Sequence, residues 1–197
     1  SLSTGYHDLV LKNGSTTISA GDQTISANAS FTSSATATPT PSITVTDHNT
    51  FTFGASSGAT AYYVSKSSTK PSSGSAQSTF ELNKWVTATS TGNLTLAENE
   101  VYYVWAEHAS STSGVVSASS ASIAVRKVTR SQGTGTTLTT KYDSSSGTAF
   151  TTGTVYVFNG SKINVTGSLA TGYKDLVLKN GSTTISAGDQ TISANAS

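Results

Sequence analysis

The first 30 residues of this chain return at residues 168–197 almost unchanged. Only two positions differ: Ser3 and His7 are replaced by Ala170 and Lys174. The two segments begin at residues 1 and 168, so the chain spans one full period of a tandem repeat and the start of the next. A period this long exceeds the unit of a solenoid and predicts separate folded modules joined in series. Such arrays usually provide reach, multivalency or mechanical span rather than chemistry at one site.

The composition predicts β structure surrounded by hydroxyl groups. Only 11% of the residues are charged, against about 25% in ordinary soluble domains, while serine and threonine dominate. Hydrophobic residues still reach 35% and include 2 Trp, 8 Tyr and 6 Phe, too many for a disordered stalk. Threonine, valine, isoleucine and tyrosine favour strands, and methionine is absent. We therefore expect an all-β chain.

The net charge and the absence of cysteine restrict the classes of partner and cofactor that this chain can bind. The net charge is +1 without a basic or acidic run, which argues against nucleic acid or an anionic membrane as a partner. We also expect no insertion into a membrane. No cysteine is present, so the chain has neither a disulfide framework nor a cysteine zinc site. We expect no cofactor. No leader or membrane-spanning stretch is visible, as expected of a segment from within an array.

The order of strand and turn signals divides the chain into three parts. Residues 1–38, with a hairpin signal at Asn13-Gly14, are expected to be the back half of a preceding module, loosely ordered or paired with a strand foreign to the array. Residues 39–126 are expected to form one β-sandwich, and residues 127–197 a second β module that lacks its last strand. The two prolines within residues 36–41 predict a stiff linker before the sandwich.

The sandwich prediction depends most on residues 96–106, LAENEVYYVWA. A leucine six residues before Tyr102, followed by alternating small apolar residues, is typical of a tyrosine corner, in which the tyrosine hydroxyl closes a crossover between sheets. Together with AYYVS at residues 61–65, this segment resembles the fibronectin type III and Ig-like modules of Gram-positive surface proteins. The resemblance covers about 85 residues and implies an Ig/fibronectin-like β-sandwich.

The second module carries a different pattern. It contains VTR at residues 128–130, GTG at 133–135, GSKINV at 160–165, GY at 172–173 and TI at 191–192. This order resembles the divergent internalin B-repeat, a small module of bacterial surface proteins. The resemblance implies a small β-grasp-like, β-rich module after the sandwich.

No catalytic constellation emerges from the motifs. Residues 54–58 match G-x-S-x-G, but that nucleophile motif requires a strand-to-helix turn and no helix is predicted here. The histidines His7, His48 and His108 are scattered, and His7 is a lysine in the other copy, which disfavours a role as base or ligand. We therefore expect no enzyme within this chain.

Other short motifs are better explained as turns or as structural residues. The run Asp47-His48-Asn49 could hold a cation, but an Asx turn is the favoured interpretation, and Gly133-Thr134-Gly135 is interpreted as a turn between strands. A Lys–Asn isopeptide bond stays open, with Lys66, Lys84, Lys127 and Lys141 as candidate lysines.

Two aromatic residues are the candidate binding site. If Tyr102, Val104 and Ala106 face inward, Tyr103 and Trp105 face outward on the same strand, where aromatic rings can stack on sugars. The alternative, which we favour, is that they cover the outer face of the sheet or the junction with a neighbouring module.

These expectations converge on a structural or adhesive repeat of an extracellular protein on a bacterial cell surface or cell wall. Such a repeat acts as a stalk or spacer that projects a binding domain, and many tethered copies also bind weakly and multivalently. Its partners are neighbouring repeats of the same chain and a host glycan or extracellular-matrix protein. Two alternatives remain: a carbohydrate-binding module using Tyr103 and Trp105, or an accessory repeat of a secreted glycosidase or peptidase.

Overall fold

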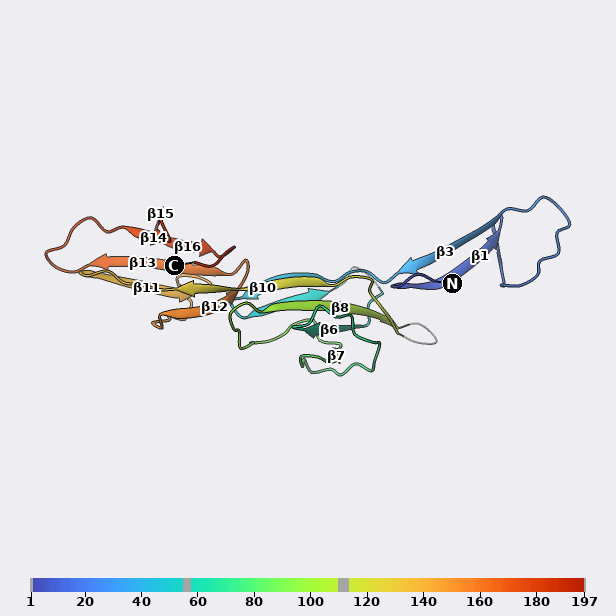
Figure 1. The fold of residues 1–197 in the computed structure, drawn as a ribbon, viewed down its shortest axis with the longest axis horizontal. Helices are drawn as coiled ribbons and strands as arrows, with labels where there is room; N and C mark the ends of the chain where they lie inside the picture. Colours follow the sequence, from blue (N-terminus) through green and yellow to red (C-terminus); the bar gives the residue numbers. More distant parts are fainter. Residues whose placement is uncertain (1, 55–57, 110–113, 197) are drawn as a thin grey trace. The chain divides into compact units, whose positions relative to one another are not determined.

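The computed structural model describes residues 2–54, 58–109 and 114–196, and within them it contains strands and turns but no helix (Figure 1). The prediction of an all-β chain is confirmed. The strands are β1 (Tyr6–Asn13), β2 (Thr16–Ile18), β3 (Phe31–Ala37), β4 (Ser42–Asp47), β5 (Thr50–Gly54), β6 (Ala61–Ser65), β7 (Trp85–Val86), β8 (Val101–Ala109), β9 (Gly114–Val116), β10 (Ala121–Thr129), β11 (Thr136–Tyr142), β12 (Thr154–Phe158), β13 (Lys162–Leu169), β14 (Leu178–Asn180), β15 (Thr183–Ile185) and β16 (Gly188–Thr191). No helix that could cross a membrane is found in these described ranges.

The chain forms two compact units. The first contains residues 1–42, 54–88 and 104–121, and the second contains residues 43–53, 89–103 and 122–197. Strands β4, β5, β8 and β10 therefore contribute residues to both units. The more specific expectations, an Ig/fibronectin-like sandwich over residues 39–126 and a β-grasp-like module over residues 127–197, stay predictions.

The first unit begins with a three-stranded antiparallel sheet in the order β2-β1-β3. Its strands meet few neighbours: every residue of β3 is exposed, and Tyr6 and Phe31 expose 43% and 54% of their surface. A bulge interrupts the β1–β3 pairing between His7 and Val10, where Asp8 adopts a φ of 54°. A small sheet without a covering layer has little apolar burial to stabilise it.

The rest of the first unit is built around two tryptophans. Strand β6 lies between β7 and β8, and β9 pairs with the end of β8. Ala61, Trp85, Trp105 and Val116 form the buried cluster, and the Trp85 indole donates to the Ser72 carbonyl at 2.8 Å.

Residues 36–41 are packed in the first unit rather than forming a free linker. Thr38 is buried, its N–H donates to the Gly5 carbonyl at 2.7 Å, and its hydroxyl donates to the Val115 carbonyl at 3.0 Å. Gly5, at a φ of 81°, lies so close to Ala118 that a Cβ there would be 2.6 Å from the Ala118 nitrogen. Gly5 of the first copy and the following Thr38 therefore pack against residues 115–118.

The second unit has two apolar centres. In the first, the fully buried Phe51 meets the rings of Tyr102 and Phe158 edge-on, with centroids 6.2 and 5.1 Å away. The Tyr102 hydroxyl donates to the Glu100 carboxylate, which also accepts the Ala97 N–H. Tyr102 thus anchors the turn that precedes its own strand.

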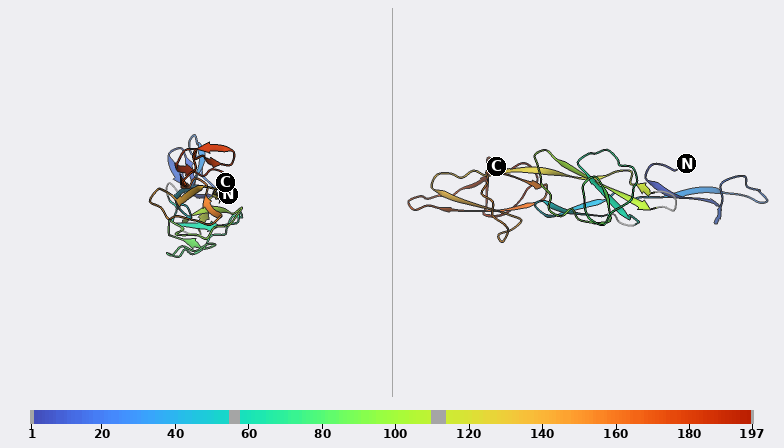
Figure 2. Two further views of the ribbon diagram at one scale, coloured as in Figure 1. Left: turned by 90° about the vertical axis from the view of Figure 1, so that its left-hand side faces the viewer. Right: turned by 90° about the horizontal axis from the view of Figure 1, so that it is seen from below.

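The other centre of the second unit lies beside a three-stranded sheet in the order β11-β13-β16. Strand β12 pairs with β10, and the hairpin β14–β15 forms a sheet of its own. Figure 2 shows these strands from two further directions. The buried cluster consists of Val128, Phe150, Val155, Val157, Ile163 and Ile192.

The two copies of the repeated segment share their local geometry. Leu11 pairs with Ile18 in the first copy, and Leu178 pairs with Ile185 at the same register in the second. The two-residue loops begin with glycines at a φ of 58° in both copies, as a type II′ hairpin turn requires. The other left-handed positions also recur in pairs: Gly5 and Gly172, Asp8 and Asp175, Gly21 and Gly188.

The strand partners of the two copies differ. In the first copy, residues 6–13 form β1 and pair with β3. In the second copy, only residues 178–180 of the equivalent stretch form a strand, and residues 188–191 pair with β13 instead. The segment therefore encodes its own turns, whereas its neighbours decide its strand partners.

Candidate functional site

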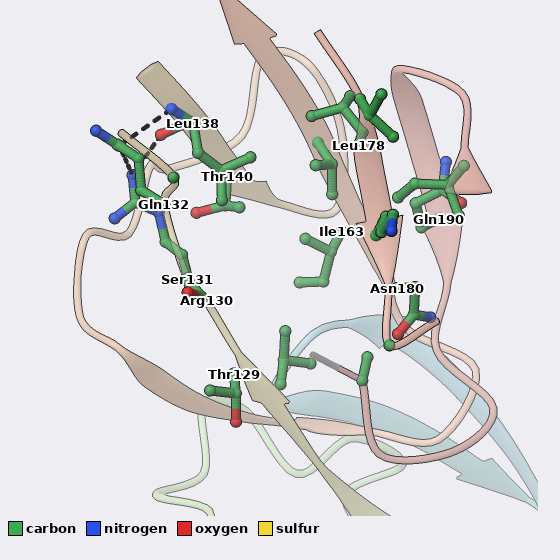
Figure 3. A pocket seen from close by; sticks show the side chains of 18 of the residues that line it. Thr129, Arg130, Ser131, Gln132, Leu138, Thr140, Ile163, Leu178, Asn180 and Gln190 are labelled. Carbon is green, nitrogen blue, oxygen red and sulfur yellow. Dashed lines mark hydrogen bonds between the residues drawn. The ribbon is translucent and has the colours of Figure 1, made fainter. Parts of the chain in front are cut away.

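An apolar cavity of about 420 Å³ lies in the second unit between the hairpin β14–β15 and the sheet β11-β13-β16. Figure 3 shows Leu138 and Thr140 on one side of it and Leu178, Asn180 and Gln190 on the other. Aliphatic side chains supply its apolar walls, and they include Leu138, Ile163, Val165, Leu176, Leu178 and Ile185. Leu176 and Leu178 reach across Gly167, where a Cβ would lie within 3.3 Å of both side chains.

One wall of the cavity is polar. The Arg130 guanidinium donates to the Leu138 carbonyl and, at 3.3 Å, to the Gln132 side chain. The Gln132 oxygen also accepts the Leu138 N–H at 3.1 Å (Figure 3). The Nε of Arg130 is buried without a hydrogen-bond partner among the described residues. The cavity is therefore suited to an apolar side chain with a polar backbone near its rim.

The large exposed hydrophobic residues of the described chain belong to the two repeated segments and to β3. They are Leu2, Tyr6, Leu9, Ile25, Phe31, Leu169, Tyr173 and Val177. Two pairs of equivalent positions are exposed in both copies, Leu2/Leu169 and Tyr6/Tyr173.

A second candidate site joins Asp47, His48 and Asp143 in the second unit. The Nδ1 of His48 lies against the Asp47 carboxylate and 3.1 Å from the Asp143 carboxylate. The His48 ring stacks on Tyr142, with centroids 3.8 Å apart. Ligand atoms of the three side chains lie within 4.8 Å of one another, so they could hold a divalent cation.

The pKa values of the two carboxyl groups of this site are shifted in opposite directions. Burial raises the pKa of Asp143, and its hydrogen bond with Asp47 and the charge of Asp47 raise it further, against the opposite effect of His48. Burial also acts to raise the pKa of Asp47, but the Asp143 hydrogen bond and His48 outweigh it and leave that pKa below its ordinary value. The pKa values of the two neighbouring carboxyl groups therefore move apart, as expected when two acids interact at close range.

The sequence missed Asp143 because it lies 95 residues from His48 and only the fold brings them together. The expected turn at residues 47–49 is present between β4 and β5. The turn at Gly133-Thr134-Gly135 is also present: the Thr136 N–H donates to the Gly133 carbonyl at 3.4 Å, and Gly135 has a φ of 72°.

His7 and His108 are far apart in the sequence and were not expected to interact, but their rings are in contact in the first unit. Their rings stack with centroids 3.8 Å apart, and His7 Nδ1 lies 2.6 Å from the Asp8 carboxylate. His7 is 4% exposed, whereas Lys174 at the equivalent position is exposed. The replacement between copies thus follows burial: the imidazole occupies the packed position and the ammonium the solvated one.

Trp105 lies on a covered part of β8. Its ring is 6% exposed in the cluster with Trp85, because β8 is covered on both faces over residues 104–107. Tyr103 is half-buried. Glycan stacking by these two residues stays a prediction, and the burial of Trp105 speaks against it.

The two remaining candidates from the sequence are the G-x-S-x-G match and the lysines that could form an isopeptide bond. Residues 55–57 of the G-x-S-x-G match lie outside the described residues. Among the candidate isopeptide lysines, Lys127 pairs with Glu98 at 3.4 Å and Lys141 donates to the Ser145 carbonyl at 2.7 Å.

Comparison of the chain with protein-family models, with curated proteins and with solved structures finds no match.

Proposed function

We propose that this chain is a structural repeat of a bacterial cell-surface protein, which acts as a stalk or spacer and projects a binding domain away from the cell wall. In this proposal each period combines an Ig/fibronectin-like sandwich with a β-grasp-like module. Weak multivalent adhesion by the many copies is a secondary role.

One observation supports the proposal above the others: a 30-residue segment recurs after 167 residues with the same hairpin register and the same left-handed turns. Because the turns are set by the segment's own sequence, the same sequence can form the same turns at every junction of an array. The packing of Thr38 and Pro41, both buried, further favours a stiff connection over a loose one.

The test is the length of arrays with one, two and four periods, measured by small-angle X-ray scattering and by electron microscopy of single molecules. A stalk predicts that each added period increases the largest dimension by the same amount. The matched control replaces residues 36–41 in every period with a Gly-Ser segment of equal length, which should shorten the mean span by increasing flexibility. An array whose dimension grows only as the cube root of its mass would contradict the proposal, because its modules would pack into a compact body.

A further inference from the structure

Two histidines and an aspartate bring metal-ligating atoms together in the first unit. His7 and Asp8 are neighbours on β1, and His108 lies near the end of β8. One ligand atom from each of the three side chains lies within 4.8 Å of the others. Imidazole nitrogens and carboxylate oxygens are ligands that zinc and related divalent transition-metal ions take.

A bulge in β1 places the first two side chains next to each other. Successive side chains of a regular strand point to opposite faces, so His7 and Asp8 would ordinarily diverge. The bulge between His7 and Val10 and the φ of 54° at Asp8 change this direction, and the Asp8 carboxylate lies 2.6 Å from Nδ1 of His7. An imidazole and a carboxylate are therefore presented together at one point of the strand.

The third side chain, His108, has a ring nitrogen without a partner. One edge of its ring faces Gly58, where a Cβ would lie 2.8 Å from Cδ2 and 3.3 Å from Nε2 of His108. On the opposite edge, Nδ1 is buried and has no hydrogen-bond partner among the residues that the structure describes. A buried polar atom of this kind costs stability unless a water molecule or an ion satisfies it.

Small rotations of the side chains are enough for all three to bind one ion. The rings of His7 and His108 stack with their planes inclined by 13°, so their in-plane lone pairs do not yet point to one centre. Bonds of about 2.0–2.2 Å require ligand atoms roughly 3.3–3.6 Å apart around a tetrahedral zinc ion. Rotation about the Cβ–Cγ bond, which is soft in both histidine and aspartate, closes the difference from 4.8 Å. Asp8 is 62% exposed, which gives an ion access from solvent.

We propose that His7, Asp8 and His108 bind one divalent transition-metal ion of the zinc class, with water completing its coordination. The ion joins the first copy of the repeated segment to β8, beside the contacts that Gly5 and Thr38 make with residues 115–118. Metal binding to residues of two distant parts of the chain stabilises the fold that brings them together. The inference goes beyond the proposed function, which requires no metal.

The second copy of the segment lacks this site because Lys174 stands at the position of His7. In the sequence alone, this replacement disfavours a ligand role for His7. The structure shows that the surrounding backbone is the same, since Asp175 has a φ of 64°. The carboxylate is thus presented in both copies, but a lysine ammonium has no lone pair for a metal. The residue at this one position decides whether a copy of the segment can bind the ion.

The test is a calorimetric titration of the whole chain with Zn²⁺, after a chelator has removed bound metal. We expect saturable binding with a dissociation constant below about 100 μM. His7→Lys, which introduces the residue of the second copy, and His108→Gln should each weaken it at least tenfold. Asp8→Asn should also weaken it, because asparagine tolerates the positive φ and removes only the carboxylate charge.

His48→Gln is the matched comparison, because it removes the remaining histidine of the chain, which belongs to the other cluster of possible ligands. It should leave Zn²⁺ binding by His7 and His108 within twofold. Imidazole nitrogen NMR signals of the unaltered chain identify the ligands directly. Those of His7 and His108 should shift on addition of Zn²⁺, so the assignment holds even where a variant loosens the segment.

Hydrogen exchange tests whether the ion joins the segment to β8. At a Zn²⁺ concentration about 100 times the dissociation constant, the amides of β1 should exchange at least tenfold more slowly in the unaltered chain. In His108→Gln the same addition should change their exchange less than twofold.

Absence of saturable binding at about 1 mM Zn²⁺ overturns the inference. Binding that His48→Gln removes and that His7→Lys and His108→Gln retain also overturns it, because the ion would then be held by the other cluster. Unchanged β1 exchange in the zinc-bound chain overturns the link between the segment and β8. The array-length measurement depends on none of these results, so a failed metal site and a failed stalk are distinguished.

Discussion

Exchanging the residue types at His7 and Lys174 measures how strongly each copy of the repeated segment depends on its neighbours. His7 is 4% exposed, stacks on His108 and lies 2.6 Å from the Asp8 carboxylate. Lys174 occupies the same position of the second copy and is exposed. We therefore expect His7→Lys to loosen the first copy and Lys174→His to leave the second copy nearly unchanged.

The expected loss of stability follows from the ring stacking that His7→Lys removes and from the ammonium charge that it buries. Loss of the stacked pair costs about 0.5–1.5 kcal/mol. A buried unpaired ammonium costs several kcal/mol more, but the long lysine stem can bring the charge towards Asp8, which is 62% exposed. We expect a net loss of about 2 kcal/mol, which is roughly a 30-fold increase in the opening equilibrium of the first copy. The exposed Lys174→His should stay within about 0.5 kcal/mol.

Amide hydrogen exchange resolves this prediction strand by strand. The amides of β1 should exchange roughly 30-fold faster in His7→Lys, while those of Val104 and Val157, both fully buried, should keep their rates. If β1 exchange changes less than twofold in His7→Lys, the packing of His7 does not hold the first copy. Equal changes in His7→Lys and Lys174→His would also refute the reasoning, because the two positions would then be equivalent.

Four further predictions follow from burial, backbone and charge. Phe51→Ala removes a fully buried ring and should cost about 3–5 kcal/mol in urea unfolding; a loss below 1 kcal/mol would contradict its packing. Burial raises the pKa of Glu107, although a hydrogen bond from a backbone N–H acts in the opposite direction, so ionisation of Glu107 reduces stability as pH rises from about 4.3 through the folded pKa. Glu107→Gln should therefore flatten this part of the curve of stability against pH. Parallel curves for the two proteins would contradict a raised pKa. Gly5→Ala and Gly172→Ala both strain a left-handed backbone by about 1–2 kcal/mol, but only the Cβ at position 5 meets neighbouring backbone, at 2.6 Å, so thermal unfolding should show a larger loss for Gly5→Ala. Burial and the neighbouring Asp47 raise the pKa of Asp143, so its ionisation reduces stability as pH rises from about 3.9 through the folded pKa; Asp143→Asn, which keeps a φ of 65° that asparagine tolerates, should flatten that part of the stability curve, and an unchanged pH dependence would contradict the raised pKa.

The features that the sequence could predict are those encoded within a few residues. Asn13-Gly14 predicts a hairpin, and that hairpin forms with the same register in both copies. The abundance of threonine, valine and tyrosine predicts the all-β class, because these side chains fit a pleated surface in almost any context. Turns and strand tendency belong to the local chain, so they can be predicted without knowledge of the neighbours.

The features that were missed depend on distant residues. Alternation along β8 placed Trp105 on the face opposite Tyr102, but alternation does not show which residues cover a face, and residues 104–107 are buried throughout. Asp143 could not be paired with His48 from the sequence, since 95 residues separate them. The exposure of Ile25 and the burial of its equivalent, Ile192, could not be predicted either, because the two identical stretches have different neighbours in the fold.

The equality of the turns in the two copies has a consequence for how genes of this type can change. Near-identical stretches of coding sequence one period apart are sites at which unequal recombination adds or removes whole periods. Because the hairpin and the left-handed positions are set within the segment, a crossover inside it joins two halves that have the same backbone geometry. After every such event each turn is intact, and each copy of the segment is still flanked by the same kinds of module. The length of the protein can therefore vary between descendants of one gene while the fold of each period stays the same.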